Sequence, residues 1–209
     1  MTHSPTPPVA VLAIDGGNSK TDVALVATDG RLLARTRGPG VPAPTVGLAR
    51  AIEVMGDLVA QAANDASLPF DRRTPIACHT AAYLAGVDIP AEQSAMDAAL
   101  QSQRWSLSTS VDNDTFAIFR AGTTAHWGVG IVAGAGVNAV GIGPDGRVVR
   151  FLAIGEITGD CGGGGELSRQ VMWHSIRDED GRGETTLLRQ AVIEHFGMGS
   201  VEEVAIAIR

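Results

Sequence analysis

The chain has 209 residues, 44% of them hydrophobic and 19% charged, so it can bury a sizeable core and is not a disordered tail. Its formal net charge of −7 argues against nucleic acid and acidic membranes as partners. Its two cysteines, Cys78 and Cys161, show no metal-ligand spacing, which argues against a disulfide scaffold or a cysteine-ligated cluster. The polar N-terminus and the lack of a long apolar run predict a cytoplasmic location.

The first part of the chain predicts three strands. A run rich in β-branched residues over 9–14 indicates a buried strand that ends in a glycine turn. Segments 21–27 and 31–37 flank an Asp-Gly pair, which is typical of a hairpin. Glycines and prolines over 38–44 predict a loop.

Helices and strands alternate after this loop. The apolar spacing over 45–66 predicts an amphipathic helix, and 90–103 predicts a second helix with a proline in its first turn. Core strands are predicted at 74–80 and 107–111. The expected fold class is therefore α/β, with a mixed sheet flanked by helices.

A similar layout begins again in the second half. Strands are predicted over 127–133, 137–142 and 147–154, and helices over 165–175, 184–194 and 200–209. Ser200 and Glu203 have the spacing of a capping box for the last helix. The repeated plan is a weak sign of a duplicated domain, with a boundary near 121–125 and an incomplete second copy.

Three glycine-containing turns, at 15–21, 134–136 and 159–165, could hold phosphate oxygens, because glycine lets several backbone N–H groups face one point. Each turn alone is weak evidence, because ordinary hairpin geometry is the simpler explanation of a single turn of this kind. The chain has no G-x-x-x-x-G-K-[ST] string. The turn at 134–136 is followed by a predicted strand, where a dinucleotide fold requires a helix.

The glycine turns carry a family resemblance. The sequence DGGNSKT at 15–21 resembles the first phosphate motif of the actin-like ATPase and sugar kinase superfamily, and GAGVN at 134–138 resembles the second. Asn113-Asp114 at the end of a strand and Gly159-Asp160 before a glycine run also match, in the right order. The chain most resembles the BadF/BadG/BcrA/BcrD-type ATPases, the group that includes N-acetylglucosamine kinase.

This resemblance implies two ribonuclease H-like domains with ATP and Mg²⁺ between them. The first would span residues 1–121, with the first phosphate motif and the base. The second, partial, would span 122–209 with the second phosphate motif, and the C-terminal region with the adenosine motif would be absent. The expected function is ATP-dependent phosphorylation of a sugar hydroxyl, with an amino sugar such as N-acetylglucosamine as substrate.

The resemblance also assigns roles to single residues. Asp114 would be the general base and Asp15 would hold Mg²⁺ through water. The residues expected at the ATP phosphates are Gly16, Gly17, Asn18, Ser19, Lys20, Gly134, Ala135 and Gly136. Those expected to bind the sugar are Asn113, Asn138 and Asp160.

Plainer structural explanations remain open for three of these residues. Asp114 has the position of a helix cap, Asn138 is also explained as a polar residue of a strand, and Asp160 as the cap of the helix that follows the glycines.

The chain departs from the family pattern at several positions. Ala135 and Val137 replace two hydroxyl residues of the second phosphate motif, and Cys161 replaces an acidic residue after Asp160. The family's Gly-Gly-Trp-Gly string reads Leu-Ala-Ile-Gly at 152–155. A sugar-contacting Asn that is common in the family after the first hairpin is replaced here by Val-Pro-Ala-Pro at 41–44. The identity of the sugar is therefore open. Because no adenosine-motif glycine pair precedes Arg209, we expect weak or no kinase activity from the 209 residues.

Two other functions stay open. One is an activator ATPase of a CoA dehydratase or reductase, which needs cysteines for an iron–sulfur cluster that Cys78 and Cys161 do not match. The other is a truncated, non-catalytic sugar-binding protein, which Ala135 and Val137 would suit. The sequence leaves the oligomeric state open, with a homodimer as one possibility.

Overall fold

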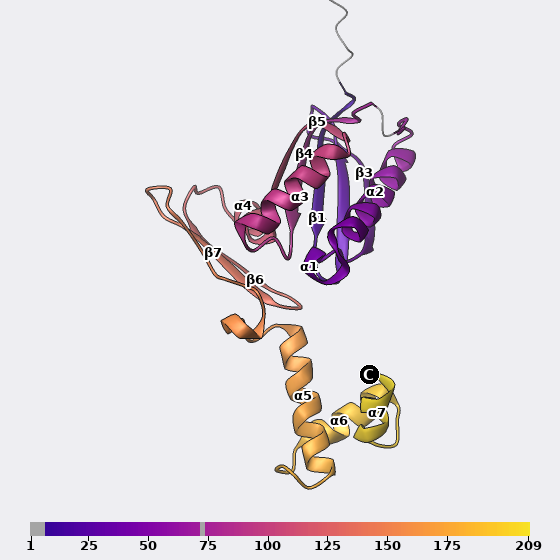
Figure 1. Ribbon diagram of the computed structural model, residues 1–209, viewed down its shortest axis with the longest axis vertical. Helices are drawn as coiled ribbons and strands as arrows, with labels where there is room; N and C mark the ends of the chain where they lie inside the picture. The colour runs from indigo at the N-terminus through magenta and orange to yellow at the C-terminus, as the bar shows by residue number, and fades with distance from the viewer. Residues whose placement is uncertain (1–6, 72–73) are drawn as a thin grey trace, which may run out of the picture. The chain divides into compact units, whose positions relative to one another are not determined.

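The computed structural model describes residues 7–71 and 74–209. The chain divides into two compact units, one of residues 1–132 and 138–154 and the other of 133–137 and 155–209. Figure 1 labels the elements of both units. Among the helices of the described residues, none combines the length and the apolar character that crossing a membrane would require.

The first unit is built on a five-stranded sheet in the order β3-β2-β1-β4-β5. Its strands are β1 (Val9–Gly16), β2 (Lys20–Val26), β3 (Leu32–Pro39), β4 (Ala77–Leu84) and β5 (Ser106–Asn113). The first three strands are antiparallel, as the Asp-Gly hairpin predicted, and β4 and β5 run parallel to β1. The carboxyl ends of β1, β4 and β5 therefore lie at one edge of the sheet.

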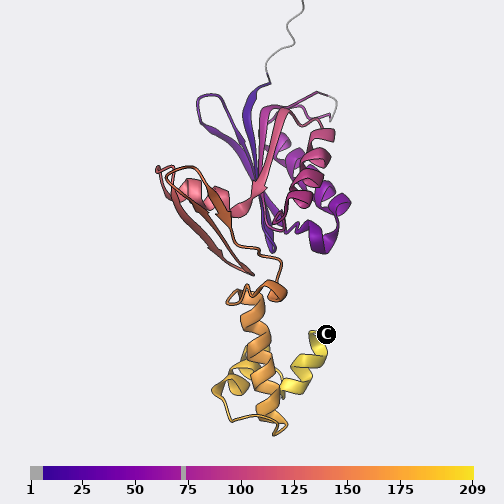
Figure 2. The ribbon, with the colours of Figure 1, turned by 60° about the vertical axis from the view of Figure 1, so that its left-hand side comes forward.

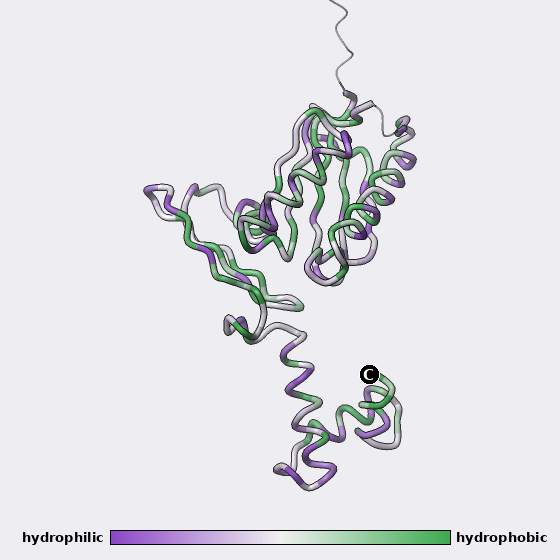
Figure 3. The backbone as a smooth tube through the Cα atoms, viewed as in Figure 1, coloured by the Kyte–Doolittle hydropathy of each residue, from purple (hydrophilic) through white to green (hydrophobic). Residues whose placement is uncertain are grey.

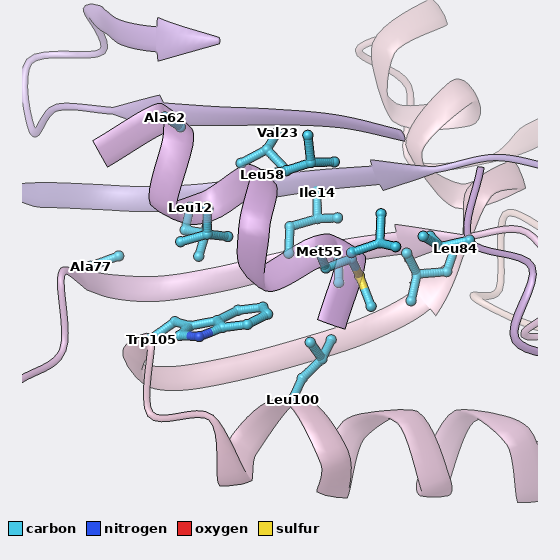
Figure 4. Close-up of a cluster of buried hydrophobic side chains, with 14 of the residues drawn as sticks. Leu12, Ile14, Val23, Met55, Leu58, Ala62, Ala77, Leu84, Leu100 and Trp105 are labelled. Atoms are coloured by element: carbon cyan, nitrogen blue, oxygen red, sulfur yellow. The ribbon is translucent and has the colours of Figure 1, made fainter. Parts of the chain in front are cut away.

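Helices α2 (Leu48–Asp65) and α3 (Pro90–Ser102) cover one face of this sheet (Figure 2). Hydrophilic and hydrophobic residues alternate along α2 (Figure 3), which fits a helix with one face on the core. Leu12, Ile14, Met55 and Trp105 are completely or almost completely buried there (Figure 4). Burial of this apolar surface is the main stabilising contribution to the unit.

The structure corrects the predicted loop at 38–44 and the predicted helix over 45–66. Strand β3 continues to Pro39, and a short helix α1 (Ala43–Val46) follows. Gly47 then interrupts the helical path with φ +86° before α2 begins. A positive φ of this size is readily adopted only by glycine, so the break depends on the residue type at this position.

The rest of the first unit comprises α4 (Asp114–Gly122) and a second, three-stranded sheet in the order β6-β7-β8. Its strands are β6 (Gly128–Ala133), β7 (Val137–Ile142) and β8 (Val148–Arg150). Strand β8 ends four residues before the predicted limit. Gly130 lies against α4, where a Cβ would approach the Phe119 Cβ to 2.9 Å, so the close contact of β6 with this helix requires a residue without a side chain.

The second unit is helical. A 3-10 turn (Glu156–Thr158) precedes α5 (Gly164–Glu179), α6 (Leu187–Phe196) and α7 (Val201–Ala207). Val192, Val201 and Val204 form its small core. The predicted cap of the last helix is confirmed at one end, since the Glu203 N–H donates to Ser200 Oγ at 3.1 Å. The Glu203 side chain accepts the reciprocal bond from the Gly199 N–H at 2.8 Å, whereas the motif predicts the Ser200 N–H as the donor.

Candidate functional site

The segment 15–20 forms the tight turn that joins β1 to β2. The Gly17 N–H donates to the Lys20 carbonyl at 2.8 Å and closes the turn. Asn18, Ser19 and Lys20 are exposed. Within the described residues, no hydrogen bond occupies the N–H groups of Asn18 and Ser19. Two free amide donors beside a lysine suit the oxygens of a phosphate group.

A second segment packs directly under this turn. The Val41 N–H donates to the Gly17 carbonyl at 3.2 Å. A Cβ on Gly40 would overlap the carbonyl group of Asn18 and lie 2.8 Å from the Ser19 nitrogen. Contact of backbone with backbone therefore fixes the turn, and Gly40 is a residue of the site that sequence reasoning placed only in a loop.

Asp15 is the residue that leads into the turn, and a charged row surrounds it. Asp15 pairs across the sheet with Asp22, and Asp22 pairs with Arg37. The Arg37 and Arg35 guanidinium groups both donate to the Asp22 carboxylate, at 2.9 and 3.0 Å, and these bonds lower the pKa of Asp22. Partial loss of hydration, followed by the charge of Asp22, raises the pKa of Asp15, although the residue as a whole stays accessible to solvent.

Asp15 and Asp22 therefore differ in their ion pairs. The two arginines balance the charge of Asp22, whereas Asp15 is exposed and forms no ion pair with them. An exposed carboxylate next to a phosphate-binding turn suits a divalent cation, because Mg²⁺ takes oxygen ligands from one or two carboxylates, water and phosphate. The residues present therefore fit the Mg²⁺ role expected for Asp15.

Asp114 lies at the carboxyl end of β5 and is the first residue of α4. The cap of this helix is Asn113, whose Oδ1 accepts the Thr115 N–H at 3.1 Å, so Asn113 performs the capping that Asp114 could have performed. Burial, followed by the negative charge of Asp15, raises the pKa of Asp114. Both aspartates lie where parallel strands end, at the same edge of the sheet.

Asn113 and Asn138 join a buried polar cluster in the first unit. Both Nδ2 groups donate to Asp88 Oδ1 at 2.9 Å, and Asn138 Nδ2 also donates to Asn113 Oδ1 at 3.2 Å. Asn113 is 0% exposed, and both polar atoms of its side chain have hydrogen-bond partners. A direct contact of Asn113 with a substrate would require it to leave these partners.

Arg150 is the fourth residue of this cluster. Neither Arg150 nor Asp88 was identified from the sequence as a residue of the site. An Nη of Arg150 donates to the Val87 carbonyl at 2.8 Å and lies 3.7 Å from Asp88 Oδ1. Asp88 is 25 and 50 residues away from the two asparagines that it binds. A lone aspartate in a strand-to-helix loop gives no signal of such distant partners, and the sequence carried no other indication.

The turn 134–136 belongs to the second unit and is held by the glycine run before α5. The Gly134 N–H donates to the Gly136 carbonyl at 2.9 Å. The Gly164 and Gly165 N–H groups donate to the carbonyls of Gly134 and Ala135, at 2.7 and 2.9 Å. A Cβ on Gly163 would lie 2.6 Å from the Gly136 Cα. The glycine run therefore packs on the predicted phosphate turn.

Asp160 organises the loop before this glycine run. Its Oδ2 accepts the Gly155 N–H at 2.7 Å and its Oδ1 accepts the Thr158 hydroxyl at 2.5 Å. The residue that caps α5 is Gly163, without a side-chain bond, and Glu166 Oε2 accepts the Gly162 N–H at 2.6 Å. The alternative in which Asp160 caps this helix is therefore wrong.

Two curated relatives resemble nearly the whole chain. N-acetyl-D-glucosamine kinase from Dictyostelium discoideum is 26% identical over 204 residues, which is 92% of this chain. N-acetylmuramic acid/N-acetylglucosamine kinase from Clostridium acetobutylicum is 24% identical over 196 residues, or 93% of this chain. The chain spans 62% of the length of each of these kinases.

Solved structures show the same fold. A candidate N-acetylglucosamine kinase from Chromobacterium violaceum matches with a TM-score of 0.74 at 24% identity, over 90% of this chain and 65% of that one. A glucokinase of the ROK family from Streptomyces griseus, in complex with glucose and AMPPNP, matches with a TM-score of 0.50 at 17% identity, over 92% and 67%. The α/β fold class of actin-like sugar kinases is thereby confirmed.

A family model settles the relationship. The model of the BadF/BadG/BcrA/BcrD ATPase family matches residues 12–201, which include both glycine turns, Asp114 and the polar cluster around Asp88. The chain belongs to the BadF/BadG/BcrA/BcrD ATPase family.

Proposed function

We propose that this protein takes part in the ATP-dependent phosphorylation of a sugar hydroxyl, with an amino sugar such as N-acetylglucosamine as substrate. The observation that carries the proposal is that β1, which leads through Asp15 into the phosphate turn, and β5, which leads into Asp114, both run parallel to β4 and end at the same edge of the sheet. A kinase needs a phosphate grip and a carboxylate for the attacking hydroxyl close together. The two relatives named as amino-sugar kinases support the choice of substrate class.

The phosphate grip is assigned to backbone groups. In this proposal the amides of Gly16, Asn18 and Ser19 bind phosphate oxygens with the Ser19 hydroxyl, and Lys20 adds positive charge. The Gly17 N–H, which the resemblance also assigned to phosphate, closes the turn on the Lys20 carbonyl instead. For the turn 134–136 of the second unit we propose that the amides of Ala135 and Gly136 bind phosphate oxygens, whereas the Gly134 N–H is used by the Gly136 carbonyl. Asp15 holds Mg²⁺ through water, and the bound ion neutralises charge on the phosphates. These residues position the nucleotide rather than take part in covalent chemistry.

Asp114 is assigned the role of general base. Its carboxylate would orient the sugar hydroxyl and accept its proton as the phosphoryl group is transferred. Asn138 and Asp160 are proposed to bind other hydroxyl groups of the sugar. For Asn113 the full burial and the α4 cap favour a role in placing Asp114 rather than a direct contact.

The test of this function uses Asp114→Asn, which keeps the size of the side chain and removes the base. We expect N-acetylglucosamine to bind the wild-type chain and the variant with similar affinity by calorimetry. We expect phosphoryl transfer from Mg-ATP to be weak in the wild-type 209 residues, so it is followed with radiolabelled ATP, and it should fall at least about a hundredfold in the variant.

Asp112→Asn is the matched control, since Asp112 is also a half-buried aspartate at the end of β5 but accepts from Gln93 at 3.0 Å. It should retain the turnover of the wild type. Equal turnover in Asp114→Asn would remove Asp114 from the mechanism, and the absence of both sugar binding and turnover in the wild type would refute the proposed function.

A second candidate function is sugar binding without phosphoryl transfer. Ala135 and Val137 in the second turn favour it, because neither side chain offers a hydroxyl to a phosphate group. In this case sugar would bind with unchanged affinity whether or not Mg-ATP is present. Calorimetric titrations with and without nucleotide separate the two functions.

A further inference from the structure

Asp88 lies in the loop between β4 and α3 and meets elements from four parts of the first unit. Its side chain is 9% exposed. One oxygen, Oδ1, accepts the amide of Asn113 at the end of β5 and the amide of Asn138 on β7, each at 2.9 Å. Arg150 on β8 lies 3.7 Å from the same oxygen. The Asp88 backbone N–H donates to Glu92 of α3 at 2.9 Å.

An ionised carboxylate accepts hydrogen bonds and donates none, so it dictates how both amides are turned. With Nδ2 of Asn113 on Asp88, its Oδ1 must face the other way. There it accepts the N–H of Thr115 at 3.1 Å and the hydroxyl of the same residue. These bonds fix the first turn of α4, which begins at Asp114. The orientation of one buried amide is thus linked to the placement of the proposed base.

We propose that Asp88 is a positioning residue, which fixes the amide orientation of Asn113 and Asn138 and thereby the start of the helix that carries Asp114. The consequence for catalysis rests on the proposed function, whereas the control of the two amides does not. Asp88 itself contacts neither substrate nor nucleotide in this assignment.

The charges around Asp88 make this role sensitive to pH. Arg150 from β8 faces it and favours ionisation, while Glu92 from α3 and Asp114 from α4 oppose ionisation. Burial is the largest effect, and the pKa of Asp88 is raised to about 6. Above this pH the carboxylate holds both amides with charge-assisted bonds, and below it a neutral carboxyl group holds them more weakly.

The decisive measurement is the side-chain amide signals of Asn113 and Asn138 in ¹⁵N-resolved NMR spectra between pH 5 and 8. We expect both pairs of signals to shift with one common midpoint near pH 6, and we expect these shifts to disappear in Asp88→Asn. Asp112→Asn is the control, because Asp112 is half-buried and near Arg150 but binds neither asparagine. Its spectra should titrate as the wild type does.

Amide signals that do not move in the wild type, or that still titrate in Asp88→Asn, would overturn the proposal. The wild-type titration decides the question even if Asp88→Asn does not fold.

A kinetic measurement tests the link to Asp114. In Asp88→Asn we expect kcat for N-acetylglucosamine phosphorylation to fall roughly fivefold to tenfold, with KM for Mg-ATP unchanged, because a neutral amide holds the two asparagines less firmly than a charged group. An unchanged kcat beside an active wild type would overturn the link. If the wild-type chain neither binds nor phosphorylates the sugar, the proposed function fails, and the NMR titration alone decides whether Asp88 controls the amides.

Discussion

At the residue scale, the cation of the cluster is Arg150. Burial raises the pKa of Asp88, Asp112 and Asp114, and the charge of Arg150 limits this rise in each of them. Its guanidinium carbon lies 5.7 Å from the centre of the Phe116 ring. Its Nε is buried and has no hydrogen-bond partner among the described residues. Arg150 is therefore held by packing and by one backbone carbonyl, and its effect on the three carboxyl groups is mainly electrostatic.

Replacing Arg150 by Met should move the pH dependence of phosphoryl transfer. The base must be ionised to work, so activity is lost as the pH falls through the pKa of Asp114, which burial and Asp15 already raise. Removal of the cation raises this pKa further, and the acid limb of kcat/KM should shift upwards by about half a pH unit to one unit. The measurement is the pH profile of sugar phosphorylation.

Arg147→Met is the matched control for this profile. Arg147 directly precedes β8 and pairs with the exposed Asp145 at 2.6 Å, so its loss should leave the acid limb in place. An equal shift in both variants would show that net charge, and not the position of Arg150, sets the profile.

At the element scale, the first turn owes its shape to the segment beneath it. Gly40→Ala should displace this turn, because the added methyl group meets backbone atoms of Asn18 and Ser19, which cannot rotate away. We expect a loss of stability of about 1–3 kcal/mol and, from the displaced amides, at least a roughly tenfold weaker affinity for Mg-ATP. Urea unfolding and calorimetric titration with nucleotide measure the two effects.

Gly122→Ala provides the comparison, because a methyl group at the end of α4 meets no atom within 4 Å. It should bind nucleotide as the wild type does. Wild-type affinity in Gly40→Ala would mean that the turn does not bind phosphate or that it tolerates displacement.

Local signals predicted most of the elements. The Asp-Gly hairpin, the β-branched run of β1 and the apolar stripe of α2 are encoded by neighbours in sequence, and each is present. The break at Gly47 was missed, because a single glycine inside a helical pattern is usually tolerated. Asp88 was missed for a different reason, since its partners Asn113 and Asn138 become neighbours only when two sheets pack. Motif spacing therefore predicts the strand ends and turns, but not the buried polar contacts behind them.

At the scale of the whole molecule, the net charge of −7 and an exposed apolar surface have opposite effects on self-association. One face of the β6-β7-β8 sheet presents Val129, Ile131 and Val149, which are 69%, 60% and 71% exposed. Val129 and Val149 line one hollow together with Gly141 of β7, and exposed apolar side chains gathered on one face favour association. Charge repulsion between molecules works against this association, and salt weakens the repulsion.

We therefore expect the chain to self-associate more strongly in 1 M than in about 0.1 M sodium chloride, as measured by sedimentation velocity. Replacing Val129, Ile131 and Val149 by Thr keeps the β-branched shape, adds a hydroxyl to each, and should keep the chain monomeric at both salt concentrations. Leu187→Thr is the control, since Leu187 is 89% exposed at the start of α6 and belongs to the other unit. If the triple variant associates as the wild type does, the sheet face is not the surface that drives association.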